Sequence, residues 1–267
     1  MEGGLTAMRE LSREEFARAA SLGGEDRPLS VQPWAVIQGY NPGRVFVDSE
    51  LRPSWAVVWI GESQRFYLLG DPCNWRFNRC LGEFFAGVIA PEATGLGRHW
   101  CQISASDCRW NRVIETAFSN RNLTRSQQVV FLYPDSPPPE QPGLPPGFRW
   151  AEVAEMRSAI RRQWGAQAAS SPGGYGYCAV CDKEVASICF VYTQTHHLGG
   201  LGIETRAEHR QKGLGRAAAA ATVREVLSRG KQPHWNCSAG NLASIATARS
   251  VGFERRVWEY TCYRFRL

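Results

Sequence analysis

The sequence predicts an α+β protein, α/β-like in its order, in which mixed β-sheets are flanked by helices. Short apolar runs typical of strands alternate with helix-like segments along most of the chain. Seven of the fifteen prolines fall within residues 134–147, which divides the sequence into two parts. A basic segment with two glycines, RQKGLGR at 210–216, stands between a strand-like and a helix-like segment, and it has no counterpart in the first part.

The composition is that of an ordinary globular protein. Of 267 residues, 43% are apolar and 21% are charged. The first sixteen residues lack a basic flank leading into an apolar run, so we expect no secretory signal and a cytoplasmic protein without a membrane partner. The net charge is +6, and arginine supplies 28 of the 31 basic residues because only three are lysine. The arginines are scattered rather than striped, so we expect no nucleic-acid partner, whereas an anionic ligand fits the charge.

The nine cysteines do not form paired metal-binding knuckles. Cys178 and Cys181 lie in a predicted strand hairpin at 175–194, where side chains three apart point to opposite faces. We therefore expect reduced, mostly buried thiols and no metal site.

The predicted domains are an N-terminal α/β domain at 1–133, a semi-rigid linker at 134–147 and a second domain at 148–267. In the second domain the predicted order is helix 151–164, hairpin 175–194, strand 198–206, helix 213–229, strand 233–238, helix 241–251 and a final strand from 256. In the first it is helix 12–20, strands 44–48, 55–60 and 66–70, helix 76–89, strand 99–103, helix 107–118 and strand 126–133. GLGRHW at 95–100 is interpreted as a surface turn.

The glycine segment has the features of a diphosphate site. A diphosphate needs several unpaired N–H donors at one place, and the first turn of a helix supplies them with the positive end of its dipole. Gly213 and Gly215 open the predicted helix, Arg210, Lys212 and Arg216 add positive charge, and five alanines follow. The alternative is a plain loop-to-helix junction with an alanine-rich packing face.

Two common phosphate loops match this segment poorly. A Walker loop needs Lys and then Ser or Thr after its second glycine, and a dinucleotide fingerprint needs a second strand ending in an acidic residue. The segment instead resembles the acetyl-CoA loop of the GNAT superfamily of N-acetyltransferases, in which Arg or Gln, two residues, Gly, one residue and Gly or Ala open a helix directly after a strand. NLASIATARSVGF at 241–253 resembles that family's next helix, with Asn241 at the usual asparagine position.

The resemblance implies a C-terminal GNAT domain with a mixed, mostly antiparallel sheet, and an N-terminal domain that is GNAT-like but lacks the loop. The wider layout is similar to the bacterial branch that includes the zwittermicin A resistance acetyltransferase. Acetyl-CoA, as co-substrate, is then expected between the strands at 201–206 and 233–237, with a backbone N–H near Ile203 or Thr205 polarising the thioester. The residues that the resemblance assigns to acetyl-CoA are Ile203, Thr205, Arg210, Gln211, Lys212, Gly213, Leu214, Gly215, Arg216, Asn241 and Ser244.

Glu204 is the predicted base, because it alternates with its strand neighbours and should point away from the face they share. The alternatives are an exposed or paired strand carboxylate, a water chain, or one of His196, His197 and His209.

Many members of the family carry a tyrosine that protonates the leaving thiolate, whereas this chain has Ala248 at that position. Cys237, Ser244 or water could take that role, or the thiolate leaves without an acid.

His234 and Trp235 are expected to line the pocket for the acceptor. The predicted activity is direct acetyl transfer to a primary amine, with a small molecule as the expected partner. The N-terminal domain would form a wall of that pocket or a homodimer surface. The alternative reading is a catalytically inactive acetyl-CoA sensor or interaction module.

Overall fold

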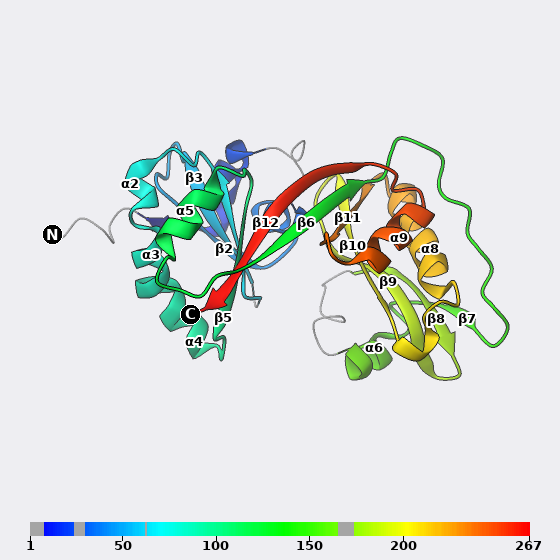
Figure 1. Cartoon of the computed structure of the whole chain (residues 1–267). Helices are drawn as coiled ribbons and strands as arrows, with labels where there is room; N and C mark the ends of the chain where they lie inside the picture. Colours follow the sequence, from blue (N-terminus) through cyan, green and yellow to red (C-terminus); the bar gives the residue numbers. More distant parts are fainter. Residues whose placement is uncertain (1–7, 24–29, 62, 165–173) are drawn as a thin grey trace. The chain divides into compact units, whose positions relative to one another are not determined.

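The computed structural model describes residues 8–23, 30–61, 63–164 and 174–267 (Figure 1). The chain forms two compact units. Unit 1 contains the chain up to Gln128 together with Trp258–Leu267, and unit 2 contains Val129–Val257. Each unit combines a mixed sheet with helices, so the predicted α+β class is confirmed.

The sheet of unit 1 has the strand order β1-β2-β3-β4-β5-β12. Its neighbours are antiparallel except for the parallel pair of β4 and β5. The elements are β1 Arg9–Glu10, the 3-10 helix η2 Arg13–Leu22, α1 Val31–Ile37, β2 Gly43–Val47, β3 Trp55–Ile60, β4 Arg65–Gly70, α2 Trp75–Asn78, α3 Leu81–Phe84, the π-helix η3 Phe85–Ile89, α4 Ala90–Gly95, β5 Trp100–Ala105, α5 Trp110–Ala117 and β12 Arg256–Arg266.

Two helical segments of unit 1 differ from the prediction. The helix expected at 76–89 is broken into α2, α3 and η3, and the π-turn lets the neighbouring Phe84 and Phe85 both enter the core. Helix α1 was not predicted. All seven of its residues are buried, so it carries no alternation between apolar and polar faces.

The sheet of unit 2 has the strand order β6-β11-β10-β9-β8-β7. Helices α8 and α9 pack with one core cluster that includes residues of β9, β10 and β11, and α6 packs with a second cluster on β7, β8 and β9 (Figure 1). The elements are β6 Thr124–Leu132, β7 Arg149–Glu152, α6 Arg157–Trp164, β8 Gly176–Cys181, β9 Glu184–Gln194, β10 Leu198–Thr205, the 3-10 turn η4 Ala207–His209, α8 Leu214–Ser228, β11 Gln232–Ser238 and α9 Leu242–Ser250.

Most elements of unit 2 follow the prediction, but the helix expected at 151–164 begins only at Arg157. The residues before it form β7, an edge strand that pairs antiparallel with β8 from Arg149 opposite Val180 to Glu152 opposite Tyr177. Strand pairing overrides the helix propensity of the alanine and glutamate residues there.

The proline-rich segment 134–147 lies inside unit 2, where it connects β6 to β7. It is held in several places. The Tyr133 hydroxyl donates to the carbonyl of Pro137, Arg224 of α8 donates to the carbonyl of Pro139, and Leu144 packs against Leu214. The segment packs along α8 of its own unit instead of separating two domains.

The boundaries of the units also differ from the predicted domains at the last strand. β12 begins beyond the second domain's core and pairs with β5 of unit 1, from Cys262 opposite Ser104 to Arg266 opposite Trp100. β6, from the first half of the sequence, stands next to β11 in unit 2. Each unit therefore completes its sheet with a strand from the other half of the sequence, an exchange that local sequence patterns do not reveal.

Within the part of the chain that the structure describes, none of the helices is both long and apolar enough to cross a lipid bilayer.

Candidate functional site

The site begins where β10 and β11 separate. Their parallel pairing runs from Leu198 opposite Gln232 to Leu201 opposite Trp235. Beyond that point, among the described residues, β10 pairs only with β9 on its other side as far as Thr205. Backbone N–H groups of a strand alternate between its two sides. Amides of β10 beyond Leu201 that face the β11 side therefore lack a strand partner from β11.

The chain after β10 makes a loop with two left-handed residues two positions apart. Gln211 has φ 60° and Gly213 has φ 76°. A methyl group at Gly213 would meet no atom within 4 Å, so the glycine is favoured for its backbone angle and not for lack of space. Left-handed residues in such succession turn neighbouring N–H groups toward one concavity, which is a common anion-binding geometry.

Helix α8 starts directly at this loop. Its first turn is closed by a bond from Ala217 N–H to the carbonyl of Gly213, so the amides of Leu214, Gly215 and Arg216 precede the regular helical pattern. A methyl group at Gly215 would lie 3.3 Å from Thr205 Oγ1, so this glycine lets the helix start close to β10. Ala217–Ala221 are all buried, which makes them a packing face as well as a slim helix.

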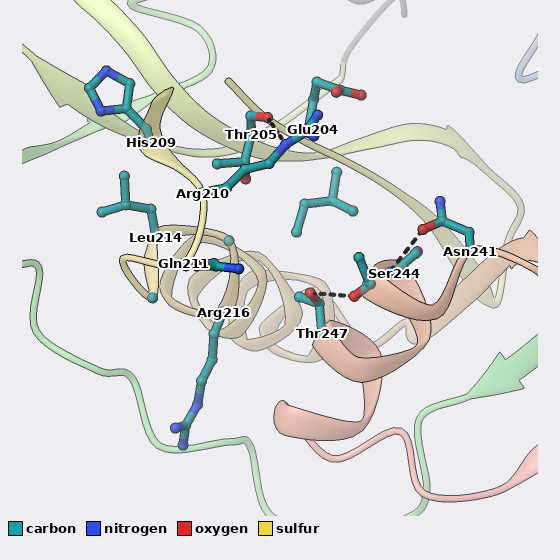
Figure 2. A pocket seen from close by; sticks show the side chains of 14 residues that line it. Glu204, Thr205, His209, Arg210, Gln211, Leu214, Arg216, Asn241, Ser244 and Thr247 are labelled. Atoms are coloured by element: carbon teal, nitrogen blue, oxygen red, sulfur yellow. Dashed lines mark hydrogen bonds between the residues drawn. The ribbon is translucent and has the colours of Figure 1, made fainter. Parts of the chain in front are cut away.

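Helix α9 forms the opposite wall. Asn241 is its N-cap, and the Asn241 side-chain oxygen accepts the N–H of Ser244 at 3.1 Å. Figure 2 shows Asn241, Ser244 and Thr247 on this wall, across from the loop residues His209, Arg210 and Leu214.

Between these walls lies a cavity of about 530 Å³. It brings together almost all residues that the resemblance assigned to acetyl-CoA, and Glu204 as well. The lining residues are Ile203, Glu204, Thr205, His209, Arg210, Gln211, Gly213, Leu214, Gly215, Arg216, Asn241, Ala243, Ser244 and Thr247.

The three positive side chains of the loop, Arg210, Lys212 and Arg216, differ in their contacts and in whether they line the cavity. Arg210 Nε donates to the carbonyl of Thr205 at 3.3 Å, and Arg216 extends away from the other labelled side chains (Figure 2). Lys212 is not part of the cavity lining among the described residues. Its ammonium lies 3.3 Å from His209 Nδ1 and 5.8 Å from the centre of the Phe148 ring.

The structure corrects the expectation for His234 and Trp235. Their exposed fractions are 0% and 2%, and neither belongs to the cavity lining. Trp235 packs against Phe253, with ring centres 5.4 Å apart, in the core between α9 and the sheet. Its position next to the end of β10 suggested a pocket wall, but the alternation of β11 turns the indole inward.

Glu204 is exposed on the cavity wall, opposite Ile188 in the register of β9 and β10. Of the three histidines considered as alternative bases, only His209 lines the cavity. His196 and His197 precede β10 at its other end, eight and seven residues before Glu204, or roughly 25 Å along an extended chain.

Ala248 is fully buried in the core and does not reach the cavity. Cys237 is half-buried, and burial raises the pKa of its thiol, an effect that a hydrogen bond from Ser244 opposes. A raised pKa keeps the thiol protonated at neutral pH, so Cys237 is a poor nucleophile.

Two groups of residues escaped prediction. Ala243 and Thr247 join the lining because α9 presents one face to the cavity. Thr247 lies three residues after Ser244 and four after Ala243, a helical spacing that could have indicated this. Phe148 and Leu144 support the loop from the proline-rich segment through His209 and Leu214. No local pattern reveals that contact.

Comparisons with known proteins agree with this geometry. Residues 150–263, which contain the whole cavity lining, match the GNAT acetyltransferase family. Across 269 aligned residues the chain is 23% identical to the uncharacterized N-acetyltransferase YdfB of Bacillus subtilis (strain 168), covering 97% of this chain and 99% of that protein.

Two solved structures share the fold over nearly the full length. The GCN5-related N-acetyltransferase-like protein from Streptococcus suis 89/1591 has a TM-score of 0.69 at 20% identity, covering 95% of this chain and 99% of that one. A tandem GNAT protein from the clavulanic acid biosynthesis pathway has a TM-score of 0.66 at 13% identity, covering 97% and 98%. At these identities the likeness concerns the fold alone. The family match spans residues 150–263 and the full-length relative is 23% identical, so the chain is similar to GNAT-superfamily N-acetyltransferases.

Proposed function

We propose that the cavity of unit 2 binds acetyl-CoA and that the protein transfers the acetyl group to a primary amine of a small molecule. The observation that carries the proposal is the pair of left-handed residues, Gln211 and Gly213, directly before the first-turn amides that open α8 at the cavity. The GNAT family implies acetyl-CoA as the co-substrate. The pyrophosphate would accept hydrogen bonds from the amides of residues 211–216, with Arg210 and Arg216 adding positive charge.

The thioester would lie where β10 and β11 separate. A backbone N–H at Ile203 or Thr205 that faces the gap would stabilise the oxygen of the thioester carbonyl as it becomes negative. Because no strand competes for such an amide on that side, it can be oriented before the reaction.

The amine would attack the thioester carbon directly. Glu204, exposed on the cavity wall, would take the proton that the amine must lose, directly or through water. The raised pKa of Cys237 supports direct attack over a cysteine-bound intermediate.

The acceptor is proposed from resemblance. The similarity to the branch that includes the zwittermicin A resistance acetyltransferase favours a small-molecule amine over a protein terminus. His234 and Trp235, the residues expected around the amine, lie in the core.

The test is a pair of glycine substitutions at the two ends of α8. Gly213→Glu puts a negative side chain where the pyrophosphate would bind, so we expect calorimetric binding of acetyl-CoA to be lost. Gly230→Glu is the matched control, because Gly230 has φ +70°, nearly the same as the +76° of Gly213, and an added Cβ meets nothing within 4 Å at either site. Equal acetyl-CoA affinity in the two variants would contradict the proposed pyrophosphate site.

Activity is tested separately with a panel of small primary amines, by release of the free thiol of coenzyme A. Transfer to at least one amine is expected from the native protein. Binding of acetyl-CoA with no thiol release across the panel would instead favour an acetyl-CoA sensor.

A further inference from the structure

Three hydroxyl groups line the cavity among the described residues: those of Thr205, Ser244 and Thr247. What each can do for a ligand depends on where its single proton already points. The hydroxyl of Thr247 donates to the carbonyl of Ala243, 2.9 Å away within α9. Its proton is therefore committed to the helix.

The hydroxyl of Thr205 is engaged as well. Its oxygen lies 2.7 Å from that of Ser187 in a hydrogen bond in which either hydroxyl can be the donor, and the Ser187 oxygen also lies 3.2 Å from the carbonyl oxygen of Glu204.

Ser244 is different because its oxygen is held as an acceptor. Trp235 Nε1 lies 3.0 Å from Ser244 Oγ, and an indole N–H can only donate. The indole is 2% exposed and packed on Phe253, so the direction of its N–H is fixed by the core. The hydroxyl proton of Ser244 must therefore point away from Trp235. Because Ser244 lines the cavity, this proton is placed where a ligand could accept it.

A sulfur atom is already within reach of that proton. Burial raises the pKa of the Cys237 thiol on β11. A hydrogen bond between this thiol and the Ser244 hydroxyl acts in the opposite direction and lowers the pKa. A protonated thiol is a weak acceptor, whereas a thiolate is a charged and much stronger one. A thiolate formed in the cavity would therefore take the hydroxyl in preference to Cys237.

The fold also explains why the hydroxyl sits here and not on residue 248. Ala248 lies one turn after Ser244 on the same helix face, and long helical side chains lean back over the preceding turn. A long side chain at 248 would reach the region of Ser244, but Ala248 is buried and has no polar atom to offer.

We propose that the Ser244 hydroxyl donates a hydrogen bond to the sulfur of coenzyme A as it leaves, with Trp235 as the positioning residue. The proposal rests on the acetyl-CoA site described under Proposed function. The amine nitrogen forms the new C–N bond, the C–S bond breaks, and its electron pair stays on sulfur. Ser244 keeps its proton, because an alcohol is a far weaker acid than a thiol, and it stabilises the thiolate until solvent protonates it.

The test is the pH dependence of binding of coenzyme A, with acetyl-CoA as the reference because it has no ionisable thiol. A donor to the thiolate lowers the pKa of the bound thiol below its ordinary value of about 8.5. The affinity for coenzyme A relative to acetyl-CoA should then rise as pH passes from the bound pKa up to the free pKa. We expect a relative gain of about tenfold, the effect of one hydrogen bond to a charged group.

Four variants make the test specific. Ser244→Ala should abolish the pH-dependent gain while acetyl-CoA still binds within about threefold of the native affinity. Ser244→Thr keeps the hydroxyl and should retain most of the gain. Trp235→Phe keeps the ring but removes the N–H, and should reduce the gain part of the way. Ser250→Ala is the control, because Ser250 is an exposed hydroxyl on the same helix that donates to the carbonyl of Thr247 outside the cavity.

The outcomes separate this proposal from the one on which it rests. Absence of binding of both ligands at every pH would overturn the acetyl-CoA site itself. Binding of both ligands with the same pH dependence in the native protein and in Ser244→Ala would overturn the role of Ser244 and leave the site standing. A loss of affinity in Ser244→Ala that is equal for both ligands at every pH would show a structural role and would overturn the proposal as well.

Discussion

Each unit contains one parallel strand pair followed by helices, but the space beyond the last paired residues is filled in unit 1 and open in unit 2. In each, a parallel strand pair is followed by a loop and helix on one strand and by a second helix on the other. The last parallel pairs are Leu68 opposite Ala105 in unit 1 and Leu201 opposite Trp235 in unit 2. The third residue after each leucine is a carboxylate, Asp71 in one and Glu204 in the other.

In unit 1 this region is filled by the protein's own groups. Ser106 donates its N–H to the carbonyl of Leu68, and the indole of Trp110 donates to the carbonyl of Gly70 at 3.3 Å. Trp110 is fully buried, and Asp71 accepts the N–H of Cys73 in a turn. In unit 2 the corresponding helix begins with the Asn241 cap and short side chains, beside a cavity. The helix after β5 starts with Trp110, which fills the space beyond the strand pair in unit 1. The helix after β11 has no tryptophan at its start, and a cavity lies beside it in unit 2.

The largest expected effect comes from removing this tryptophan. Trp110→Ala should lower the free energy of unfolding by about 3–5 kcal/mol, because it leaves a cavity in the core of unit 1. Chemical denaturation measures the loss, and calorimetry measures acetyl-CoA binding, which should keep a stoichiometry of one. A second molecule bound per chain would show that Trp110 alone prevents binding in unit 1.

The two carboxylates provide the next comparison. Glu204→Gln should lower kcat for amine acetylation about a hundredfold if Glu204 accepts the proton, with little change in acetyl-CoA affinity. Asp71→Asn is the counterpart in unit 1, and it should leave kcat unchanged because an amide oxygen can still accept the Cys73 N–H. Native activity of Glu204→Gln from acid to alkaline pH would exclude Glu204 as the base.

Each unit has a left-handed glycine near its parallel strand pair. Gly70 ends β4 in a crowded position, whereas Gly213 follows β10 with no atom near its missing side chain. Gly213→Ala should cost about 1–2 kcal/mol of folding stability, from the backbone angle alone. Gly70, with φ +91°, has the same requirement, and an added Cβ there would lie 2.2 Å from the Ser54 carbonyl oxygen. Gly70→Ala should therefore be more destabilising by a further 1–3 kcal/mol, the range for overpacking. Equal midpoints of thermal unfolding for the two variants would contradict this difference.

The smallest effect concerns two contacts between aromatic rings and cations, one on a half-buried Phe148 and one on an exposed Trp75. Phe148→Ala removes the ring that lies against His209 and Lys212, and we expect acetyl-CoA affinity to fall about threefold as the loop loses this support. Trp75→Ala in unit 1 removes a similar contact with Arg76 and Arg79 and should not change that affinity. A decrease of the same size in both variants would show that the effect is not specific to the loop.

Sequence reasoning located the cavity of unit 2 well, because each part of it depends on local chemistry. The loop glycines, the capping Asn241 and the exposed Glu204 are determined by turn, cap and strand geometry within a few residues. The predictions for His234 and Trp235 were wrong, because strand alternation and core packing decide which way a side chain at a strand end points.

Long-range pairing explains the other differences. The edge pairing of β7, the packing of Leu144 beneath the loop and the placement of β12 beside β5 all join residues far apart in the sequence. Periodicity within a window carries no information on such partners. The predicted boundaries at 133 and 148 marked a change in composition, whereas the units divide at 128 and 257.

The exchange of end strands has a consequence for the order in which the molecule is made. Tyr263 and Phe265 of β12 belong to the core of unit 1, yet they are synthesised after every residue of unit 2. Unit 1 must wait until β12 has been made before its sheet is whole, even though its other strands are synthesised first. A shortened chain that retains every residue of the cavity but stops before Trp258 would leave β5 with an exposed edge, and such edges promote aggregation.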